Sequence, residues 1–258
     1  MIKRLILKNR PSVIRLIIKA PTREKIVIKV SDPTKPNTLF TDRYAFIDNI
    51  EEFFVLMPQA PYYAEVSVYN ERNGLQMIDN SFEVQSIISE DYNVPKYKFS
   101  KKTQSFIKFS QEFSLECGYL SYSKKGDIYK SNNGKFRIDY FDVIRSVANQ
   151  RPLETPARIS QLTGRIECSA QSFKKYSVPM RMAILLHEYA HYYINRNPRS
   201  EVQADLNGLF IYLKLGYPKI DIYNVFISVF LKSPTQQNKQ RFDILNDFVR
   251  KNRLWILW

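Results

Sequence analysis

The first 90 residues alternate polar and apolar side chains over short stretches, which is the pattern of strands with one buried face. Stretches that combine this pattern with β-branched or aromatic residues lie at residues 5–7, 13–17, 25–30 and 63–69. Turn-forming residues between the stretches include Pro11, Pro21, Pro33 and Gly74. Short strands at this spacing predict a β-sandwich of roughly seven or eight strands, a module that usually binds or docks.

Later in the chain the pattern changes to longer segments with helical periodicity, mixed with a few short strand-like segments. A helix is expected at residues 106–116. A hairpin of strands is expected at 127–129 and 135–140, because Asn133 and Gly134 form a turn signal between them. Further helices are expected from Glu201 to Leu215, over about 222–231, and from about 235 to 251.

At 258 residues and 44% hydrophobic content, the chain is long and apolar enough for two cores. We therefore expect an α+β fold in two parts. An N-terminal β-sandwich docking domain covers residues 1–90, and a polar, basic linker covers 91–104. The second domain covers 105–258 and contains a small sheet followed by the C-terminal helices.

One helix of the second domain carries the most specific motif in the chain. Ser177 can cap its start and Pro179 suits its first turn. Its residues are apolar on nearly every face, so we expect it to be buried. Within this apolar run stand His187, Glu188 and His191, which include both histidines of the chain. Burial of an unpaired imidazole or carboxylate is unfavourable, so these side chains need partners, and a metal ion is one such partner.

His187 and His191 are four residues apart, so on a helix their imidazoles point the same way. Two nitrogen ligands on one face, with the Glu188 carboxylate beside the first, are how a helix holds a catalytic zinc ion and its general base. The HExxH pattern therefore predicts His187 and His191 as zinc ligands and Glu188 as the catalytic base.

The segment after this helix offers a third ligand. Ser200 begins a capping box that opens another helix, so Glu201 lies in its first turn and Asp205 follows on the same face. HExxH followed by Glu-x-x-x-Asp resembles the zincin metallopeptidases whose third ligand is a glutamate. The resemblance implies that Glu201 is a zinc ligand and that Asp205 holds the imidazole of His187 by a hydrogen bond. Ligating histidines usually donate their other N–H to such a carboxylate.

Two alternatives stay open in the sequence. Only 9 residues separate His191 from Glu201, fewer than in the best-known zincins, so Asp205 is the second choice for the third ligand. The histidines can also be structural core residues that hydrogen-bond Glu201 or Asp205, because HExxH turns up by chance in unrelated chains.

The resemblance also implies an edge strand that borders the catalytic cleft and pairs with an extended substrate. The short segment Ile166, Glu167, Cys168 and Ser169 lies just before the HExxH helix, and we expect it to be this substrate-binding strand. An ordinary inner strand fits the same residues. Residues 155–158 are expected to form a loop.

The mechanism implied by the motif is hydrolysis of a peptide bond by water that the metal activates. Glu188 would take the proton of the water and pass it to the leaving amine. An additional donor to the oxyanion is expected. Because the chain has no third histidine, a tyrosine would have to serve, and the candidates are Tyr212, Tyr217 and Tyr223.

The formal net charge is +14, which is unusual for a plain protease. Residues 1–30 contain nine Lys and Arg residues against Glu24 alone, a local excess of +8. Such a basic face suggests an acidic partner surface or nucleic acid as a binding partner. Solvated strand faces whose lysines protect the edges of a sheet give the same composition.

No apolar run approaches the ~18 residues of a membrane-spanning helix, so we expect no membrane span. Residues 1–8 begin basic but turn polar too soon for a signal peptide, and we therefore expect a cytoplasmic protein. Cys117 and Cys168 form no disulfide framework and are expected to be buried free thiols without a metal role.

The leading hypothesis is a zinc-dependent endopeptidase whose substrate is a protein segment in extended conformation. The layout as a whole, a β-sandwich joined to a zincin-like domain with a basic face, is also similar to proteins of large tailed bacteriophages. That similarity implies the alternative of a structural ring protein of the virion or tail connector, active or inactive. Its partners would be copies of itself or other virion proteins, docked through the apolar residues 254–258.

Overall fold

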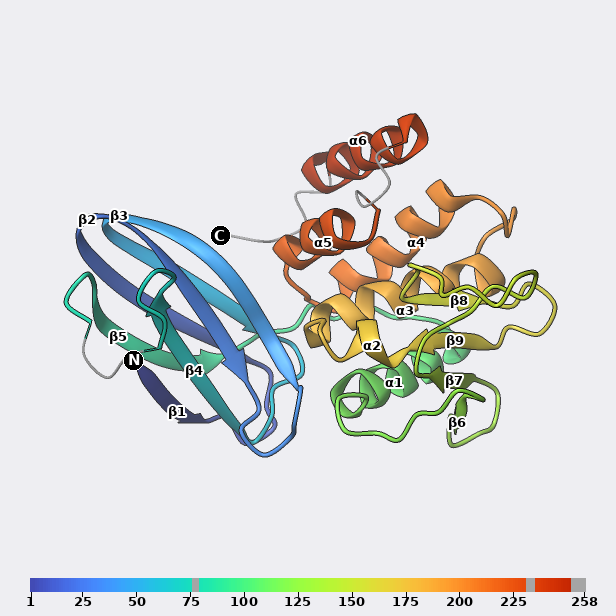
Figure 1. The fold of residues 1–258 in the computed structure, drawn as a ribbon, viewed down its shortest axis with the longest axis horizontal. Helices are drawn as coiled ribbons and strands as arrows, with labels where there is room; N and C mark the ends of the chain where they lie inside the picture. Colours follow the sequence, from blue (N-terminus) through green and yellow to red (C-terminus); the bar gives the residue numbers. More distant parts are fainter. Residues whose placement is uncertain (76–78, 231–234, 252–258) are drawn as a thin grey trace. The chain divides into compact units, whose positions relative to one another are not determined.

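The computed structural model describes residues 1–75, 79–230 and 235–251. The chain divides into two compact units, Met1–Pro95 and a second unit that begins at Lys96. Among the described residues the first unit contains only strands, whereas the second combines helices with a small sheet, so the fold is mixed α+β (Figure 1). The apolar residues 254–258, for which we predicted docking, lie outside the described residues.

The first unit is built around one long strand, β2. Its described strands are β1 (Ile2–Ile6), β2 (Ser12–Ser31), β3 (Leu39–Met57), β4 (Tyr63–Asn70) and β5 (Glu83–Asp91). One edge of β2 pairs with β3 along nearly its whole length. The other edge pairs with β5 in its first half and with β4 in its second half, and β1 extends the sheet beyond β4. All these pairs are antiparallel.

The described residues of the unit form five strands instead of the predicted seven or eight short ones, and one reason is that two predicted strands are one. The chain continues from residues 13–17 to 25–30 without leaving the sheet, and only the register with β3 slips between Ala20 and Glu24. Pro21 lies within this irregularity, where a missing backbone N–H breaks no ladder hydrogen bond. The described part of the unit therefore has five strands, two of them very long.

The second unit contains a four-stranded sheet. Its strands are β6 (Asp127–Lys130), β7 (Arg137–Phe141), β8 (Ala157–Ile159) and β9 (Ile166–Ser169). The order is β6-β7-β9-β8, with β7 and β9 parallel and the other neighbours antiparallel. The predicted turn between β6 and β7 is present, with Gly134 at a φ of 68°. The sheet therefore has β9 inside and β8 at an edge.

This order corrects the predicted position of the substrate-binding strand. Residues Ile166–Ser169 pair with β7 on one side and with β8 on the other, so neither edge can accept another strand. The edge next to the helices belongs to β8, where we predicted a loop at residues 155–158. β8 has only 3 residues, too few to show a periodic pattern in the sequence.

Helices make up the rest of the second unit. They are α1 (Lys101–Glu116), α2 (Ala170–Phe173), α3 (Val178–Tyr193), α4 (Glu201–Lys214), α5 (Lys219–Val225), the π-helix η1 (Phe226–Phe230) and α6 (Gln236–Lys251). α1 begins inside the predicted linker, because Ser100 accepts a hydrogen bond from the N–H of Thr103 and caps the helix there. Within the described ranges, none of the helices has both the length and the apolar content that crossing a bilayer requires.

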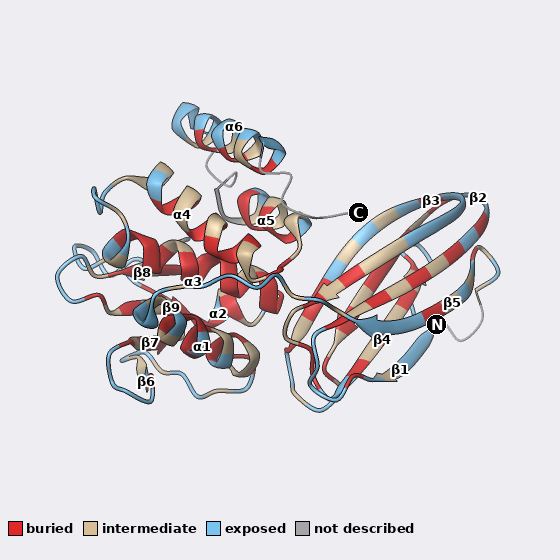
Figure 2. Cartoon of the chain, turned by 180° about the vertical axis from the view of Figure 1, so that it is seen from behind, coloured by how far each residue is buried: buried red, intermediate tan, exposed pale blue. Residues whose placement is uncertain are grey.

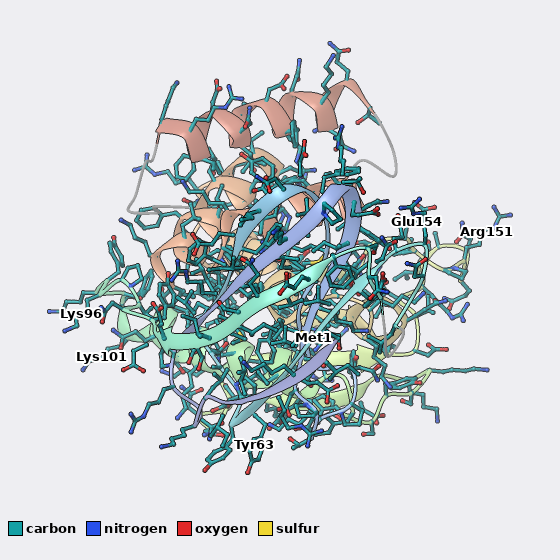
Figure 3. The ribbon with its side chains drawn as sticks, turned by 90° about the vertical axis from the view of Figure 1, so that its left-hand side faces the viewer. Met1, Tyr63, Lys96, Lys101, Arg151 and Glu154 are labelled. Carbon is teal, nitrogen blue, oxygen red and sulfur yellow. The ribbon has the colours of Figure 1, made fainter. Side chains whose placement is uncertain are left out.

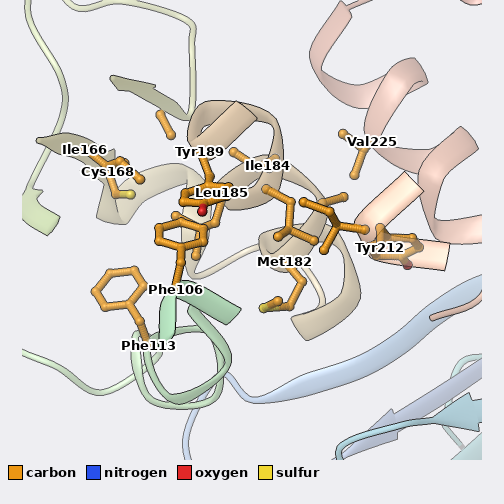
Figure 4. Packing of buried hydrophobic residues seen from close by; sticks show 14 of the residues in the cluster. Phe106, Phe113, Ile166, Cys168, Met182, Ile184, Leu185, Tyr189, Tyr212 and Val225 are labelled. Carbon is orange, nitrogen blue, oxygen red and sulfur yellow. The ribbon is translucent and has the colours of Figure 1, made fainter. Parts of the chain in front are cut away.

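α3 lies at the centre of the second unit and is buried along most of its length (Figure 2). On one side, Phe106 of α1 stacks on Tyr189 with the ring centroids 4.1 Å apart (Figure 4). Near the start of the helix, the fully buried Arg181 donates hydrogen bonds to the carbonyl oxygens of Phe173 and Ser114, each at 2.7 Å. These contacts fix α3 against α1 and α2 and so fix the position of its motif residues.

Candidate metal centre

The two histidines of α3 point from the same face of the helix into the same region. The helix begins as predicted, with Ser177 Oγ accepting a hydrogen bond from the N–H of Met180 and Pro179 in the first turn. His187 and His191 follow on one face, with their ring centroids 4.7 Å apart. Their Nε2 atoms are 3.0 Å apart, so the two nitrogens share one small region of space.

α4 brings a carboxylate to the same space. Ser200 Oγ accepts a hydrogen bond from the N–H of Gln203 and caps the helix, which places Glu201 in the first turn as predicted. Gly208 allows the two helices to approach closely, since a Cβ atom there would lie 2.9 Å from the backbone nitrogen of His187. This close approach sets the start of α4 beside the histidines.

Three donors converge as a result. Oε2 of Glu201 is 3.5 Å from Nε2 of His187, and Oε1 is 3.5 Å from Nε2 of His191. One donor atom from each of the three residues lies within 4.8 Å of the other two. Two imidazole nitrogens with one carboxylate oxygen are a donor set that zinc accepts and that leaves a coordination position open. His187, His191 and Glu201 could therefore hold a metal ion.

The second nitrogen of each imidazole fixes the orientation of its ring. Nδ1 of His187 lies 2.9 Å from Oδ1 of Asp205, and Nδ1 of His191 lies 2.7 Å from the carbonyl oxygen of Pro198. With Nδ1 donating, Nε2 of each ring offers the lone pair that a metal needs. Asp205 thus has the contacts of an orienting group, and it is Glu201 that faces both Nε2 atoms, which favours our first assignment over a ligand role for Asp205.

A further charged residue of the site, Arg241 of α6, was not predicted. Its guanidinium holds Asp205 by two hydrogen bonds, from Nε to Oδ2 at 2.7 Å and from Nη2 to Oδ1 at 3.0 Å. Nη2 is also 3.1 Å from Oε2 of Glu201. Arg241 and Asp205 are both buried, so this pair is shielded from water, whereas the side chain of Glu201 is partly exposed. Its helix is rich in charged residues, and no sequence pattern distinguishes Arg241 from the exposed arginine of the same helix, Arg250.

The electrostatics of this group favour a bound cation. Burial by itself would lower the pKa of His187, but hydrogen bonds with Asp205 and Glu201 raise it to about 10. Burial by itself would raise the pKa values of Glu201 and Asp205. Hydrogen bonds with His187 and His191 lower the pKa of Glu201, and hydrogen bonds with His187 and Arg241 lower the pKa of Asp205. The cluster therefore favours positive charge next to the two carboxylates, which a metal ion would supply, and metal binding would compete with protonation of the histidines.

Glu188 lies beside the donors without being one of them. Its side chain is buried and lines the same cavity as His187. Burial raises the pKa of Glu188, and a hydrogen bond from the backbone of Ile159 in β8 opposes this shift. A carboxylate with a raised pKa takes up and releases a proton nearer to neutral pH, which suits a general base.

The site opens into a cavity of about 410 Å³. Its apolar lining includes Ile184, Leu209, Val225 and Phe226. Its polar lining includes Thr155, Arg158, Gln161 and Arg199. β8 is part of the wall, so the edge strand of the sheet borders the converging donors.

The predicted oxyanion tyrosines make other contacts. Tyr212 lines the cavity, but its hydroxyl donates a hydrogen bond to the carbonyl oxygen of Pro218 at 3.1 Å. The hydroxyl of Tyr223 donates to Oδ1 of Asn246 at 3.1 Å. Tyr217 is buried and stacks on Tyr212. The arrangement therefore gives no support to an oxyanion role for these tyrosines.

The residues of the predicted substrate strand, Ile166–Ser169, lie away from the cavity walls. Glu167 forms ion pairs with Nε of Arg158 at 2.7 Å and with Nη2 of Arg165 at 3.1 Å. Ile166 and Cys168 are buried in the hydrophobic core. Their role is therefore to build the sheet, and β8 takes the place at the cavity that we had predicted for β9.

The two cysteines are free and buried, as predicted. Burial raises the pKa of Cys117 to about 11 and raises that of Cys168 as well. Neither thiol belongs to the converging donors among the described residues. Both cysteines are therefore core residues of low reactivity.

Comparison of the chain with models of protein families, with curated proteins and with solved structures gives no match. The function is therefore inferred from the residues of the site.

Proposed function

We propose that the second unit is a metal-dependent endopeptidase with zinc as its metal. The supporting observation is the convergence of His187, His191 and Glu201 in a cavity that also contains the Glu188 carboxylate. A structural pair of histidines needs a hydrogen-bond partner for each ring, and Asp205 and the Pro198 carbonyl already provide these. A purely structural pair of histidines would need neither the carboxylate of Glu201 nor the buried carboxylate of Glu188.

The ligand atoms suit zinc, and neighbouring groups hold the ligand side chains in place. Two histidines and a glutamate are a common protein ligand set of catalytic zinc sites. Arg241 and Asp205 hold Glu201 and His187 in place, as the supporting groups of metal ligands usually do. When bound, zinc supplies a Lewis acid that activates water and polarises the scissile carbonyl.

Glu188 is the residue that moves protons. It takes one from the attacking water and gives it to the amine that leaves. The backbone of Ile159 orients its carboxylate, and burial keeps its pKa above the ordinary value. These features support a base that is ionised before attack and can be protonated in the course of the reaction.

Strand β8 supports binding of a substrate in extended conformation. Among the described residues, only β9 pairs with it, so its other edge offers backbone groups to a peptide. The edge borders the cavity, and a peptide added there passes the converging donors. Substrates are therefore expected to be unfolded or flexible protein segments.

Cleavage of an unfolded protein by the full chain and by Glu188→Gln tests the proposal. Glutamine keeps the size of the side chain but cannot accept a proton from water. We expect the variant to retain its metal and to cleave at least about 100-fold more slowly, since general-base catalysis contributes about 10²–10⁴-fold.

Glu112→Gln changes an exposed carboxylate on α1 and serves as the matched control. Undiminished cleavage by Glu188→Gln would contradict the proposed mechanism. Loss of the metal in that variant would show that Glu188 maintains the site instead of acting as its base. A folded chain that binds no metal and cleaves nothing would favour the structural virion protein.

A further inference from the structure

The positive charge of this protein lies in its second unit. Residues 1–95 contain 12 Lys and Arg residues and 12 Asp and Glu residues, so their formal net charge is zero. Residues 96–258 contain 27 basic and 13 acidic residues, which is the whole of the +14. The basic excess that we noted at residues 1–30 is balanced by the strands that pair with it.

Ion pairs across the first sheet show this balance directly. Arg4 pairs with Glu65 at 3.2 Å, and Lys25 pairs with Glu71 at 2.6 Å. Arg15 on β2 forms an ion pair with Glu52 on β3. A polyanion that approached these three side chains would have to displace carboxylates, which makes this part of residues 1–30 less favourable for nucleic acid.

In the segment that leads into α1, the basic residues have no acidic residues near them in sequence. Between Asp91 and Glu112 the chain contains five lysines and no acidic residue. In Figure 3 the side chains of Lys96 and Lys101 extend outward on the same side of the view. Among the described residues, no ion pair involves these five lysines, whereas Arg4, Arg15 and Lys25 of the first sheet each form one.

The start of α1 forms one wall of a hollow of about 690 Å³. Its lining residues are Lys101, Lys102, Ser105, Asn133, Lys135, Phe136 and Tyr193. Nζ of Lys102 lies over the ring of Tyr193, 4.2 Å from its centroid. The hollow thus gathers three ammonium groups and an aromatic ring, and none of its lining residues is acidic.

The position of these lysines is unfavourable for the helix alone. Lys101 and Lys102 occupy the first turn of α1, which contains no acidic residue. The N-terminal end of a helix carries partial positive charge, so cations there destabilise it. A bound anion would reverse this effect, because it would interact with the lysines and the helix dipole together.

The ring of Tyr193 is covered by Lys102 and by the ring of Tyr189, which stacks on it with the centroids 4.9 Å apart, so an exposed ring for a partner with flat apolar parts has to come from the neighbouring segment. Tyr97, in the same acid-free segment, is 45% exposed, and its ring packs edge-on against Phe210 with the centroids 5.4 Å apart. Single-stranded nucleic acids bind surfaces of this kind, with phosphates on cations and unpaired bases stacked on rings. Acidic peptides lack the stacking part.

We propose that this surface, defined by Lys96, Lys98, Lys101, Lys102 and Lys135 and named the α1 basic face, binds the phosphate backbone of single-stranded nucleic acid. The proposal does not depend on metal binding or on proteolysis. Tyr193 and His191 are two residues apart on α3, so the hollow and the metal centre lie on different faces of that helix.

Fluorescence anisotropy of a labelled oligothymidylate, titrated with the full chain at several salt concentrations, tests this inference. We expect Lys101→Gln/Lys135→Gln to weaken binding roughly tenfold and to reduce the slope of log affinity against log salt by about 1.4, since each lysine neutralises about one phosphate and each phosphate of a single strand contributes about 0.7 to the slope. The matched control is Lys8→Gln/Lys19→Gln, which removes two exposed lysines of residues 1–30 and should change little.

Three results would overturn the inference. The first is no salt-dependent binding by the unchanged protein at low salt. The second is an equal loss of affinity in both double variants, which would assign binding to general charge. The third is a preference for polyglutamate or for duplex DNA over the oligothymidylate, which would identify another kind of partner.

Discussion

At the candidate metal centre, each residue that could bind a metal has a second group that holds its side chain in place. His187 has Asp205 behind it, His191 has the carbonyl of Pro198, and Glu201 has Arg241. Each holder restricts a side chain that would otherwise sample several rotamers, so the donors are in place before a metal arrives. The strength of metal binding is therefore expected to depend on residues that do not touch the metal.

Asp205→Asn tests this dependence. The amide keeps the shape of the side chain but removes the charge that holds Nδ1–H of His187 and the guanidinium of Arg241. We expect metal affinity to fall by about 10–100-fold, the usual effect of removing such a partner. Competition with a chromophoric chelator measures it, and Asp243→Asn, an exposed position on α6, is the control. Unchanged affinity would mean that Asp205 serves the fold alone.

The sequence predicts which residues form the site where these residues lie close together along the chain. His187, Glu188 and His191 share one helix, and Glu201 and Asp205 share the next, so helical geometry and one capping box were enough to group them. Arg241 lies 36 residues beyond Asp205 and joins the site only because α6 packs on α4. No local pattern encodes that contact.

Among the elements, the contact of α3 with α4 decides the geometry of the site. The two helices are close enough that Gly208 faces the backbone of His187 and Leu186. A larger residue would separate the helices at the level of the metal ligands. The glycine is therefore expected to be needed for approach, although alanine favours helix formation by about 1 kcal/mol over glycine in a helix interior.

Gly208→Ala sets these two effects against each other. The added Cβ would lie 2.9 Å from the backbone nitrogen and 3.0 Å from the Cα of His187, and backbone atoms cannot move aside as a flexible side chain can. We expect the free energy of unfolding to fall by about 1–3 kcal/mol, as in other overpacked contacts. Urea denaturation measures it, and a gain in stability would show that the helices have room to spare.

The elements that the sequence did not predict are those whose form depends on partners. β8 has 3 residues and becomes a strand because β9 pairs with it. β2 passes through Pro21 as one strand because β3 continues beside it on both sides of the irregularity. Helices α3 and α4 were predicted well, since their caps and apolar patterns are local.

For the whole molecule, the distribution of charge between the two units indicates where a polyanion can bind, which the net charge alone does not. The sequence gives +14 and a basic start, which we interpreted as a basic first domain. Pairing of the strands brings carboxylates to those basic residues, and the excess is left to the second unit. Binding of polyanions is therefore expected to depend on the α1 basic face and to be separable from the metal centre by mutation.

Metal content of the purified full chain, measured beside His187→Ala, tests the central claim most directly. We predict about one zinc ion per chain in the unchanged protein and none in the variant, with circular dichroism showing that both are folded. A folded protein without metal after incubation with zinc would contradict the account. It would mean that the two histidines and Glu201 form a hydrogen-bonded core cluster.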